Sequence, residues 1–528
     1  MIYRLKPPNS LWDSCLFEWD GTFHLYHLES SEKLWDRLGH AVSADLVHWE
    51  ARDPIHIAGR PGDWNEGPMI LTGMVVPHDG RFYLFAGGRT GGRQVMGVFT
   101  SGDLDHWEVH PASPVLCPEG PHYLSKPTPH CPEVDWRDPC IHYRKDDGHY
   151  HALLCARLPE MSHRHSGATI AHVRSRDLIR WEHLPPIQAP TGRFYDTEVP
   201  DVFEMDGRYY LLFSTASSGA FQINTAGREN ATGTFYMVGD DVDGPFSLPD
   251  EYLLIGAGQG KMAAYCGRTI AHEDGRLFYH HINHGGDIRA VPQKQADREL
   301  RHHVNYGGDI RSCRHAWGSP KRVRTSDGKL YLEYMPILER LETGILCGSV
   351  AELPVFDAPD LGRWERAGGR ISARSDVRMS SCRICRDAGD LHLACEVRAS
   401  SDSRPGFLLR SAAGEAALVT LNFARQRLEI GTCTNDRSGW GLGMDDVLTG
   451  VGVSCLYSDL CAAELKDHVP YRVRCFARDE HFEVYLDGRW VFTTVLPHAA
   501  RRGDIELCVA GGAAEFSDLR IAAIEPFA

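Results

Sequence analysis

The sequence feature that most constrains the fold is a motif, Ser-x-Asp-Leu-x-x-Trp-Glu, which occurs three times in the N-terminal part of the chain. Its copies occupy residues 43–50, 101–108 and 175–182. A short alternating run rich in aromatic residues precedes each copy, which is the pattern of a β-strand. These runs lie at residues 23–28, 82–85 and 150–154. A unit of about four strands that repeats every few tens of residues predicts a β-propeller, in which each blade buries its faces against its neighbours.

The strand runs and the turns between them predict five blades. The first three cover about residues 13–50, 68–108 and 138–182, the fourth begins at residue 198, and the fifth ends near residue 334. Within the repeated motif, we expect the Asp to cap a tight turn through its side chain. We expect the Trp to pack between blades.

The repeat fades beyond about residue 345, and the sequence continues as alternating runs such as residues 391–397 and 482–486. Alternation of this kind, without the repeated motif, is typical of a β-sandwich. We therefore predict an all-β chain in which a five-bladed β-propeller over residues 1–340 is followed by a β-sandwich over residues 345–528.

Composition excludes several classes of function. The net charge of −15 would repel the phosphate backbone of a nucleic acid. No apolar run approaches the roughly 20 residues that span a bilayer. The N-terminus lacks the apolar core of a secretory signal, so we expect a cytoplasmic protein that binds neither nucleic acid nor membrane. The sequence leaves the oligomeric state open.

The 16 cysteines are scattered along the chain. In a cytoplasmic protein we interpret them as reduced, buried side chains. Cys382 and Cys385 form a close pair, but a zinc site of this type needs a second pair, or histidines, at matching spacing. We therefore expect no metal and no other cofactor.

Three carboxylates begin strand-like runs at the openings of predicted blades, namely Asp13, Asp138 and Glu198. The innermost strands of a propeller converge on a central funnel, so these side chains could meet there. Glycoside cleavage needs one carboxylate as nucleophile or base and one carboxylic acid to protonate the leaving oxygen. Hydrogen bonds to ring hydroxyls, a task open to the third carboxylate, add further stabilisation. The sequence therefore predicts a glycosidase that acts on a small saccharide.

Several segments of the chain resemble glycoside hydrolase family 32, the invertases, levanases and inulinases, with relatives in families 43 and 68. The resemblance rests on residues 43–50, 136–139, 198–201 and 317–321, and it is strongest at the Arg-Asp-Pro sequence of residues 137–139. It implies a five-bladed propeller with a sandwich and no metal in the chemistry. It also implies that the enzyme cleaves a furanosyl linkage, most specifically a β-fructofuranosyl linkage, by a retaining double displacement.

The same resemblance assigns a role to each carboxylate: Asp13 is the nucleophile, Asp138 stabilises the transition state and Glu198 is the acid/base. Four further residues are candidates for substrate binding: Trp12, Arg137, Trp64 and Asn65. Trp12 could stack on a sugar face or plug the propeller as a buried side chain. Trp64 and Asn65 could line the mouth of the funnel or cap a blade.

The chain departs from the family around the proposed nucleophile and acid. The family usually has Asn before the nucleophile and Pro-Asn-Gly after it, whereas this chain has Trp12 and Ser14-Cys15. The acid is followed by Val199 instead of the common Cys. The sugar that is cleaved could therefore be a furanose other than fructose. Two other functions also stay open: an inverting enzyme like family 43, which cleaves arabinofuranosides or xylosides, and a sugar-binding propeller without catalysis.

A second repeat, His-His-x-Asn-x-Gly-Gly-Asp-Ile-Arg with one change, occupies residues 280–289 and 302–311. It could be a duplicated strand and turn, or it could supply polar walls for a sugar pocket. The sequence does not assign its role.

Overall fold

The structure, a computed structural model, describes most of residues 2–527. The residues outside the description within this range are 7–8, 31–34, 36, 58, 67–69, 162–165, 216–223, 226–227, 230–231, 258–263, 274, 283–314, 359–361, 377–378, 436–452 and 497–498. The chain forms two compact units, one of residues 2–225 with 229–332 and one that consists mainly of residues 333–528. This division falls a few residues before the boundary that the sequence predicts at 340–345.

The described residues are almost entirely β-structure. Their helical segments are short 3₁₀ turns, namely η1 (Thr191–Arg193), η4 (Pro336–Leu341) and η5 (Val350–Glu352). Among the described residues, no helix has the length and apolar character that crossing a membrane requires.

The first unit consists of four-stranded antiparallel sheets followed by a fifth sheet built from β19 to β23. The strands of the first three sheets are β1 (Ser10–Trp19), β2 (Thr22–Ser30), β3 (Arg37–Ser43) and β4 (Glu50–Ile55); β5 (Leu71–His78), β6 (Arg81–Thr90), β7 (Arg93–Ser101) and β8 (Glu108–Val109); β9 (Trp136–Arg144), β10 (His149–Arg157), β11 (Ala168–Ser175) and β12 (Glu182–Leu184). Those of the later sheets are β13 (Glu198–Met205), β14 (Arg208–Thr215), β17 (Thr232–Gly239) and β18 (Leu253–Ala257); β19 (Ala264–His272), β20 (Gly275–Ile282), β21 (Ala316–Trp317), β22 (Lys321–Ser326) and β23 (Lys329–Glu333). The short strands β15 (Asn224–Thr225) and β16 (Arg228–Glu229) pair with each other.

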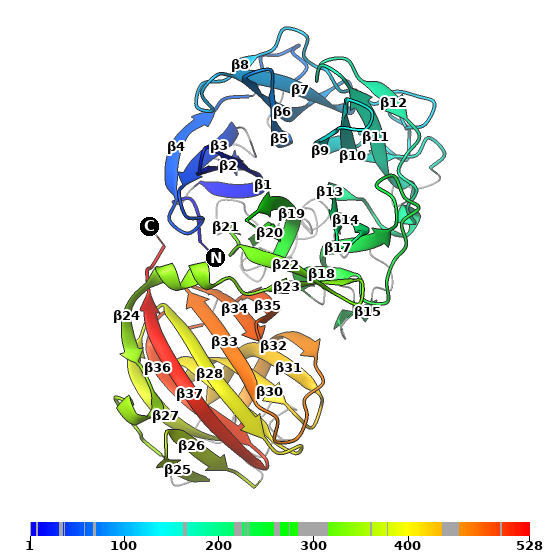
Figure 1. Cartoon of the computed structure of the whole chain (residues 1–528). Coiled ribbons are helices and arrows are strands. Elements are labelled where there is room, and N and C mark those ends of the chain that lie inside the picture. Colours follow the sequence, from blue (N-terminus) through cyan, green and yellow to red (C-terminus); the bar gives the residue numbers. More distant parts are fainter. Residues whose placement is uncertain are drawn as a thin grey trace. The chain divides into compact units, whose positions relative to one another are not determined.

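The first strands of these sheets surround the centre of the unit (Figure 1). Strand β1 contacts β5, β5 contacts β9, β9 contacts β13, β13 contacts β19, and β19 contacts β1. A ring of sheets that closes through its innermost strands is a β-propeller, because closure leaves no exposed inner edge. The three copies of the repeated motif lie in the first three sheets, as the sequence predicted.

Each copy of the repeated motif forms the same turn before the fourth strand of its sheet. In the first copy, Asp45 Oδ1 accepts hydrogen bonds from the backbone N–H groups of Val47 at 3.0 Å and His48 at 2.8 Å. Asp103 and Asp177 accept the equivalent bonds in the other two copies. The Asp therefore caps the turn through its side chain, as expected.

The tryptophan of each copy packs edge-on against an aromatic ring of the preceding sheet in the ring. The pairs, with their centroid distances, are Trp107 with Tyr26 at 5.8 Å, Trp181 with Phe85 at 5.9 Å, and Trp49 with Trp317 at 5.1 Å. This edge-to-face geometry is favourable for aromatic pairs. The motif thus joins neighbouring blades, which explains why it recurs once in each of three blades.

The second unit packs two antiparallel sheets around one apolar core, to which Leu393 and Val473 contribute from one sheet and Phe407 and Leu421 from the other. The first sheet contains β35 (Arg489–Val495), β34 (His481–Leu486), β33 (Tyr471–Arg478), β28 (Leu391–Ala399), β37 (Ala513–Ile524), β26 (Arg370–Arg374) and β25 (Arg363–Ala367), with β24 (Glu342–Cys347) beside β37. The second contains β27 (Ser380–Ala388), β36 (Gly503–Ala510), β29 (Arg404–Ala412), β30 (Glu415–Asn422), β31 (Arg427–Asn435) and β32 (Val453–Ala462). This is the predicted β-sandwich.

Candidate active site

A one-residue β-bulge occurs in each of the five central strands, β1, β5, β9, β13 and β19. At each bulge the central strand advances by three residues while the neighbouring strand advances by two. The bulged segments are residues 11–14, 71–74, 137–140, 198–201 and 265–268. A bulge bends its strand and re-aims the side chains next to it. Asp138, Val199 and Cys266 have φ values of 59°, 50° and 51° within these bulges. The candidate site is built on this set of bulges.

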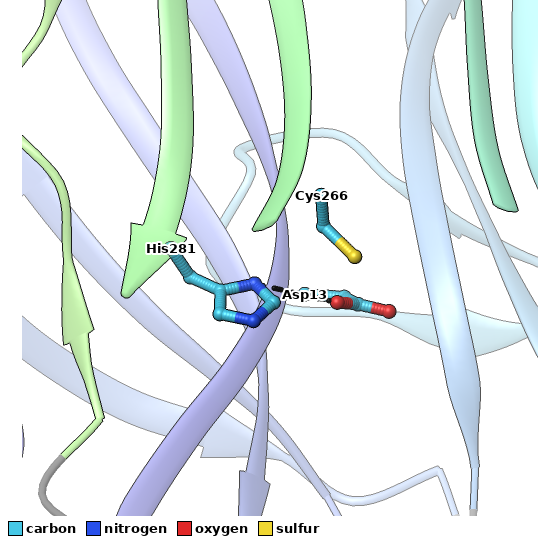
Figure 2. Close-up of side chains that lie close together, drawn as sticks. All are labelled: Asp13, Cys266 and His281. Carbon is cyan, nitrogen blue, oxygen red and sulfur yellow. Dashed lines mark ion pairs between the residues drawn. The ribbon is translucent and has the colours of Figure 1, made fainter. Parts of the chain in front are cut away.

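Asp13 lies in the first bulge and has polar neighbours from two other blades. Thr72, in the bulge of β5, donates its hydroxyl to Asp13 Oδ2 at 2.9 Å. His281 of β20 places Nδ1 3.4 Å from Asp13 Oδ1, and Cys266 lies beside the same carboxylate (Figure 2). Burial lowers the pKa of His281 to about 3. At neutral pH this contact is therefore a neutral imidazole beside a carboxyl group.

Arg137 connects the carboxylates of two neighbouring bulges. Its Nη2 is 2.9 Å from Glu198 Oε1, and its Nε is 3.4 Å from Asp138 Oδ2. The same guanidinium lies 2.6 Å from Asp135 Oδ1 and 3.6 Å from Asp196 Oδ2. Arg137 is only 9% exposed. Buried carboxylates are stable in a protein only when a partner compensates their charge. Arg137 contacts two buried carboxylates, those of Asp138 and Asp196, and two that are partly exposed, those of Asp135 and Glu198.

Glu198 is held at both of its carboxylate oxygens. Tyr265, in the bulge of β19, donates its hydroxyl to Oε2, while Arg137 donates to Oε1. The backbone N–H of Val199 donates in turn to Asp138 Oδ2 at 3.1 Å. The bulges of β9 and β13 are therefore bonded to each other through both of their acidic side chains, which fixes the orientation of those side chains.

Arg268, the last residue of the β19 bulge, binds the backbone of two neighbouring bulges. Its Nη2 donates to the carbonyl oxygens of Asp138 at 2.9 Å and Pro139 at 3.1 Å, and its Nη1 donates to that of Gly73 at 3.5 Å. A bulge interrupts the hydrogen bonds of the ladder, and buried carbonyl groups need partners. Arg268 supplies them from a position that is only 4% exposed.

Burial and mutual repulsion raise the pKa values of the acidic side chains. Burial, followed by the negative charges of Asp138 and Glu198, raises the pKa of Asp13 to about 7. Burial raises the pKa of Asp138 to about 6, although the charge of Arg137 opposes this change. The pKa of Asp196 is also raised well above its usual value, chiefly by burial. Because Asp13, Asp138 and Asp196 are close-set charges, their protons are gained and lost in coupled steps that belong to the set and not to single residues. Such a set can hold one acid protonated and another ionised, which acid–base chemistry requires.

Trp12 is buried, with 6% of its surface exposed. Its ring lies 4.3 Å from that of His281, 4.8 Å from that of His315 and 5.5 Å from that of Trp35, measured between centroids. These contacts correspond to the alternative in which Trp12 plugs the propeller. Stacking on a sugar stays a prediction for this residue.

Trp64 and Asn65 lie at the entrance to the second sheet. The ring of Trp64 covers Gly97 of β7, where an added Cβ would lie 2.1 Å from the ring. Asn65 is buried and donates its side-chain amide to the carbonyl oxygen of Ile57. These are the contacts of residues that cap a blade, and their part in substrate binding stays a prediction.

Of the repeated segments at 280–289 and 302–311, the structure describes residues 280–282, which end strand β20. Residues 283–289 and the whole second copy lie outside the described residues. Within the described part, His281 belongs to the candidate site through its contact with Asp13.

Sequence reasoning missed several residues of the site, namely Thr72, Asp196, Tyr265, Cys266 and Arg268. None of them belongs to the segments that resemble a known family. A signal was nevertheless present, because four of these residues lie in the bulged segments at 71–74 and 265–268. An alignment of the first strands of all the blades, including those without a carboxylate, would have placed these four residues at positions equivalent to those near the three acids.

Comparisons with known proteins concern the family and the fold of the chain. The model of the family described as glycosyl hydrolases family 32 N-terminal domain matches residues 7–276. The chain is 27% identical over 227 residues to a probable sucrose-6-phosphate hydrolase of Vibrio cholerae, which covers 40% of this chain and 37% of that protein. It is 28% identical over 395 residues to the β-fructofuranosidase insoluble isoenzyme 6 of Oryza sativa subsp. japonica, which covers 69% of this chain and 59% of that protein. Both matches span less than two thirds of the relative's length.

Among solved structures, a GH32 β-fructofuranosidase of Bombyx mori is similar along the whole chain. Its TM-score is 0.65 at 16% sequence identity, with 99% of this chain and 93% of that one covered. At this identity the likeness concerns the fold. It confirms the all-β propeller followed by a sandwich.

Proposed function

Since the chain belongs to glycosyl hydrolases family 32, we propose that it hydrolyses a β-fructofuranosyl linkage of a small saccharide by a retaining double displacement. The observation that supports this proposal is that Asp13, Asp138 and Glu198 all lie in bulges of the central strands, where Arg137 contacts Asp138 and Glu198 and the charges of both acids act on Asp13. The names of the relatives, a β-fructofuranosidase and a sucrose-6-phosphate hydrolase, support the same substrate class.

In the first step, Asp13 attacks the anomeric carbon of the sugar and the bond to the leaving oxygen breaks. Glu198 gives its proton to that oxygen, so that the leaving group departs as a neutral alcohol. In the second step, Glu198 takes a proton from water, and the water displaces Asp13 from the same carbon. Thr72 orients the nucleophile through its bond to Oδ2, while Arg137 and Tyr265 orient the acid.

Asp138 has a different part, because its carboxylate is tied to the N–H of Val199 and to Arg137. A carboxylate held in this way is a fixed acceptor for ring hydroxyls, and hydrogen bonds of this kind strengthen as the oxocarbenium-like transition state forms. It also supplies negative charge beside the developing positive charge of the ring.

The test is a hydrolysis panel that contains sucrose, short fructans, aryl arabinofuranosides and aryl xylosides. We expect release of fructose, and loss of the rate by on the order of 10³-fold or more in Asp13→Asn. A matched control is Asp146→Asn, which changes an exposed carboxylate outside the site. Cleavage of arabinosides or xylosides without release of fructose would contradict the proposed substrate. Sugar binding without turnover of any member of the panel would contradict the proposed catalysis.

A further inference from the structure

Asp13, Cys266 and His281 bring three different metal-ligating atoms to one point beside the central strands. One carboxylate oxygen, the thiol sulfur and one imidazole nitrogen all lie within 4.8 Å of one another. They come from β1, β19 and β20, and in Figure 2 the side chains of Cys266 and His281 lie next to the Asp13 carboxylate. The packing of the first and fifth blades therefore forms the group.

The imidazole of His281 also points to a ligand, because it is a buried polar group whose hydrogen-bonding capacity is unused within the described part of the chain. The side chain is fully buried, and among the described residues neither ring nitrogen has a hydrogen-bond partner. Its Nδ1 lies 3.4 Å from Asp13 Oδ1 without the geometry of a hydrogen bond. Buried polar groups in proteins are nearly always bonded, so a buried nitrogen with a free lone pair beside a carboxylate and a thiol suggests a site for a cation.

We propose that these three side chains form a binding site for a thiophilic divalent ion such as Zn²⁺, and that the bound ion inhibits the hydrolase. Sulfur, nitrogen and oxygen donors in one set favour zinc, whereas magnesium and calcium prefer oxygen alone. Three protein ligands leave one position for water, as in an open zinc site. When the ion binds, the Cys266 thiol loses its proton to solvent and the thiolate takes its place as a ligand.

The geometry needs only a small adjustment. Zinc–ligand bonds of about 2.0–2.3 Å place neighbouring ligand atoms of a tetrahedral site roughly 3.5 Å apart. The Asp13 and His281 atoms already have about this spacing at 3.4 Å. To complete the site, the sulfur of Cys266 must move closer to the other two ligand atoms. Rotation about the Cα–Cβ bond of its short side chain can provide this movement. The ion reaches the site past Asp13, whose side chain is 13% exposed while that of His281 is fully buried.

The inhibition rests on the proposed function, because Asp13 cannot attack the sugar while its carboxylate is bound to the ion. The ion takes no part in the reaction itself. Hydrolysis should therefore be fastest in the presence of a chelator and should fall as free Zn²⁺ rises. The binding itself does not depend on the proposed function, so the two can be tested apart.

The binding test uses the full chain, freed of metal by a chelator, and Zn²⁺ alone as the probe. Competition with a chromogenic chelator gives the affinity and the number of ions, and zinc X-ray absorption gives the ligands. We expect one ion per chain bound to one sulfur, and at least a tenfold weaker affinity in Cys266→Ser and in His281→Gln. Cys117→Ser removes a half-buried thiol elsewhere in the propeller and should leave the affinity unchanged.

Two results would overturn the site: an absorption spectrum without a sulfur ligand, or an affinity that Cys266→Ser leaves unchanged. If the variants do not fold, the absorption spectrum of the unchanged protein decides alone. A bound ion with the expected ligands that leaves hydrolysis at full rate would overturn the inhibition. Absence of hydrolysis in every condition would count against the proposed function while leaving the binding result intact.

Discussion

Arg137 Nη2 lies 2.9 Å from Glu198 Oε1, so a residue that adjoins one acid of the site is bonded to another acid 61 positions later in the chain. Together with its contact to Asp138 Oδ2, this bond makes one guanidinium the common partner of two carboxylates with different proposed roles. A guanidinium is suited to this task because its donors form a rigid, planar fork that stays charged at all relevant pH values.

The first prediction concerns removal of this partner. Arg137→Met takes this cation away from the buried carboxylates of Asp138 and Asp196, and breaking a buried ion pair costs about 3–5 kcal/mol of unfolding free energy. Arg137→Lys keeps a charge but loses the fork, so we expect a folded protein with a kcat lowered by about 10²-fold or more. Denaturant unfolding and sucrose hydrolysis measure the two effects. Arg174→Met removes a more exposed partner of Glu182 and should cost at most about 1 kcal/mol. Equal stability losses in the two Met variants would refute the compensating role of Arg137.

The second prediction concerns the proton donor. Glu198→Gln keeps the shape of the side chain but has no proton to give to the leaving oxygen. We expect hydrolysis of sucrose to slow by about 10²–10⁴-fold, and hydrolysis of an aryl fructoside with a good leaving group to slow much less at its first step. Pre-steady-state release of the phenol measures that step. Glu182→Gln changes an exposed carboxylate and serves as the control. Equal losses on both substrates would exclude Glu198 as the acid.

The third prediction follows from the pKa of Asp13, which burial and the charges of Asp138 and Glu198 raise to about 7. Asp13 must be ionised to attack, so kcat/KM, which reports the free enzyme, should fall as pH decreases below about 7. Asp138→Asn removes one of the negative charges that raise this pKa. The acid limb of its residual activity should therefore move to lower pH, and a pH profile on an activated substrate measures the shift. An acid limb that stays in place would show that the limb does not report Asp13.

The fourth prediction concerns stability. A carboxyl whose pKa is higher in the folded protein than in the unfolded chain binds more protons when folded, so stability falls as pH rises between the two values. For Asp13 this window runs from the ordinary carboxyl pKa of 3.8 to a pKa of about 7. Asp13→Asn removes the effect, and the variant should therefore gain stability over the wild type as pH rises, by on the order of 4 kcal/mol between pH 4 and 8.

Comparing the two proteins at each pH cancels the contribution of the buried histidines, whose lowered pKa values act in the opposite direction. Among these are His40 and His142, each with a pKa of about 3. Denaturant midpoints across the pH range measure the difference, with Asp146→Asn as the exposed control. If the difference in unfolding free energy between wild type and Asp13→Asn does not change with pH, then burial does not raise the pKa of the Asp13 carboxyl.

The sequence predicted the parts of this molecule that depend on local and repeated signals. The propeller followed from the motif at residues 43–50 and its copies, because the capping Asp and the packing Trp recur in three successive blades. Asp13, Asp138 and Glu198 could be placed together because carboxylates at strand openings are conspicuous. The bulges could not be predicted, since a single extra residue in a strand leaves no clear mark on its alternation.

The sequence also did not reveal the partners of Asp13 that come from blades whose first strand has no candidate carboxylate. Thr72 and Cys266 are ordinary strand residues in the sequence, and only the bulges of β5 and β19 bring them to Asp13. The contact of Trp64 with Gly97 likewise joins an entering loop to the middle of a strand. Contacts of this kind depend on how blades pack, which no single blade encodes.

The last prediction is stereochemical. If Asp13 is the nucleophile, two displacements occur at the same carbon, and the product keeps the configuration of the substrate. Free furanoses mutarotate and obscure the outcome, so the reaction should be run with methanol as acceptor and the anomer of the methyl fructoside read by NMR. A β-fructoside should give the methyl β-fructofuranoside, and Asp13→Asn should form it more slowly by on the order of 10³-fold or more. The methyl α-anomer would mean that a single displacement takes place. In that case water or methanol attacks directly, Asp13 acts as a general base, and the carboxyls must stand about 6.5–9.5 Å apart to admit the acceptor.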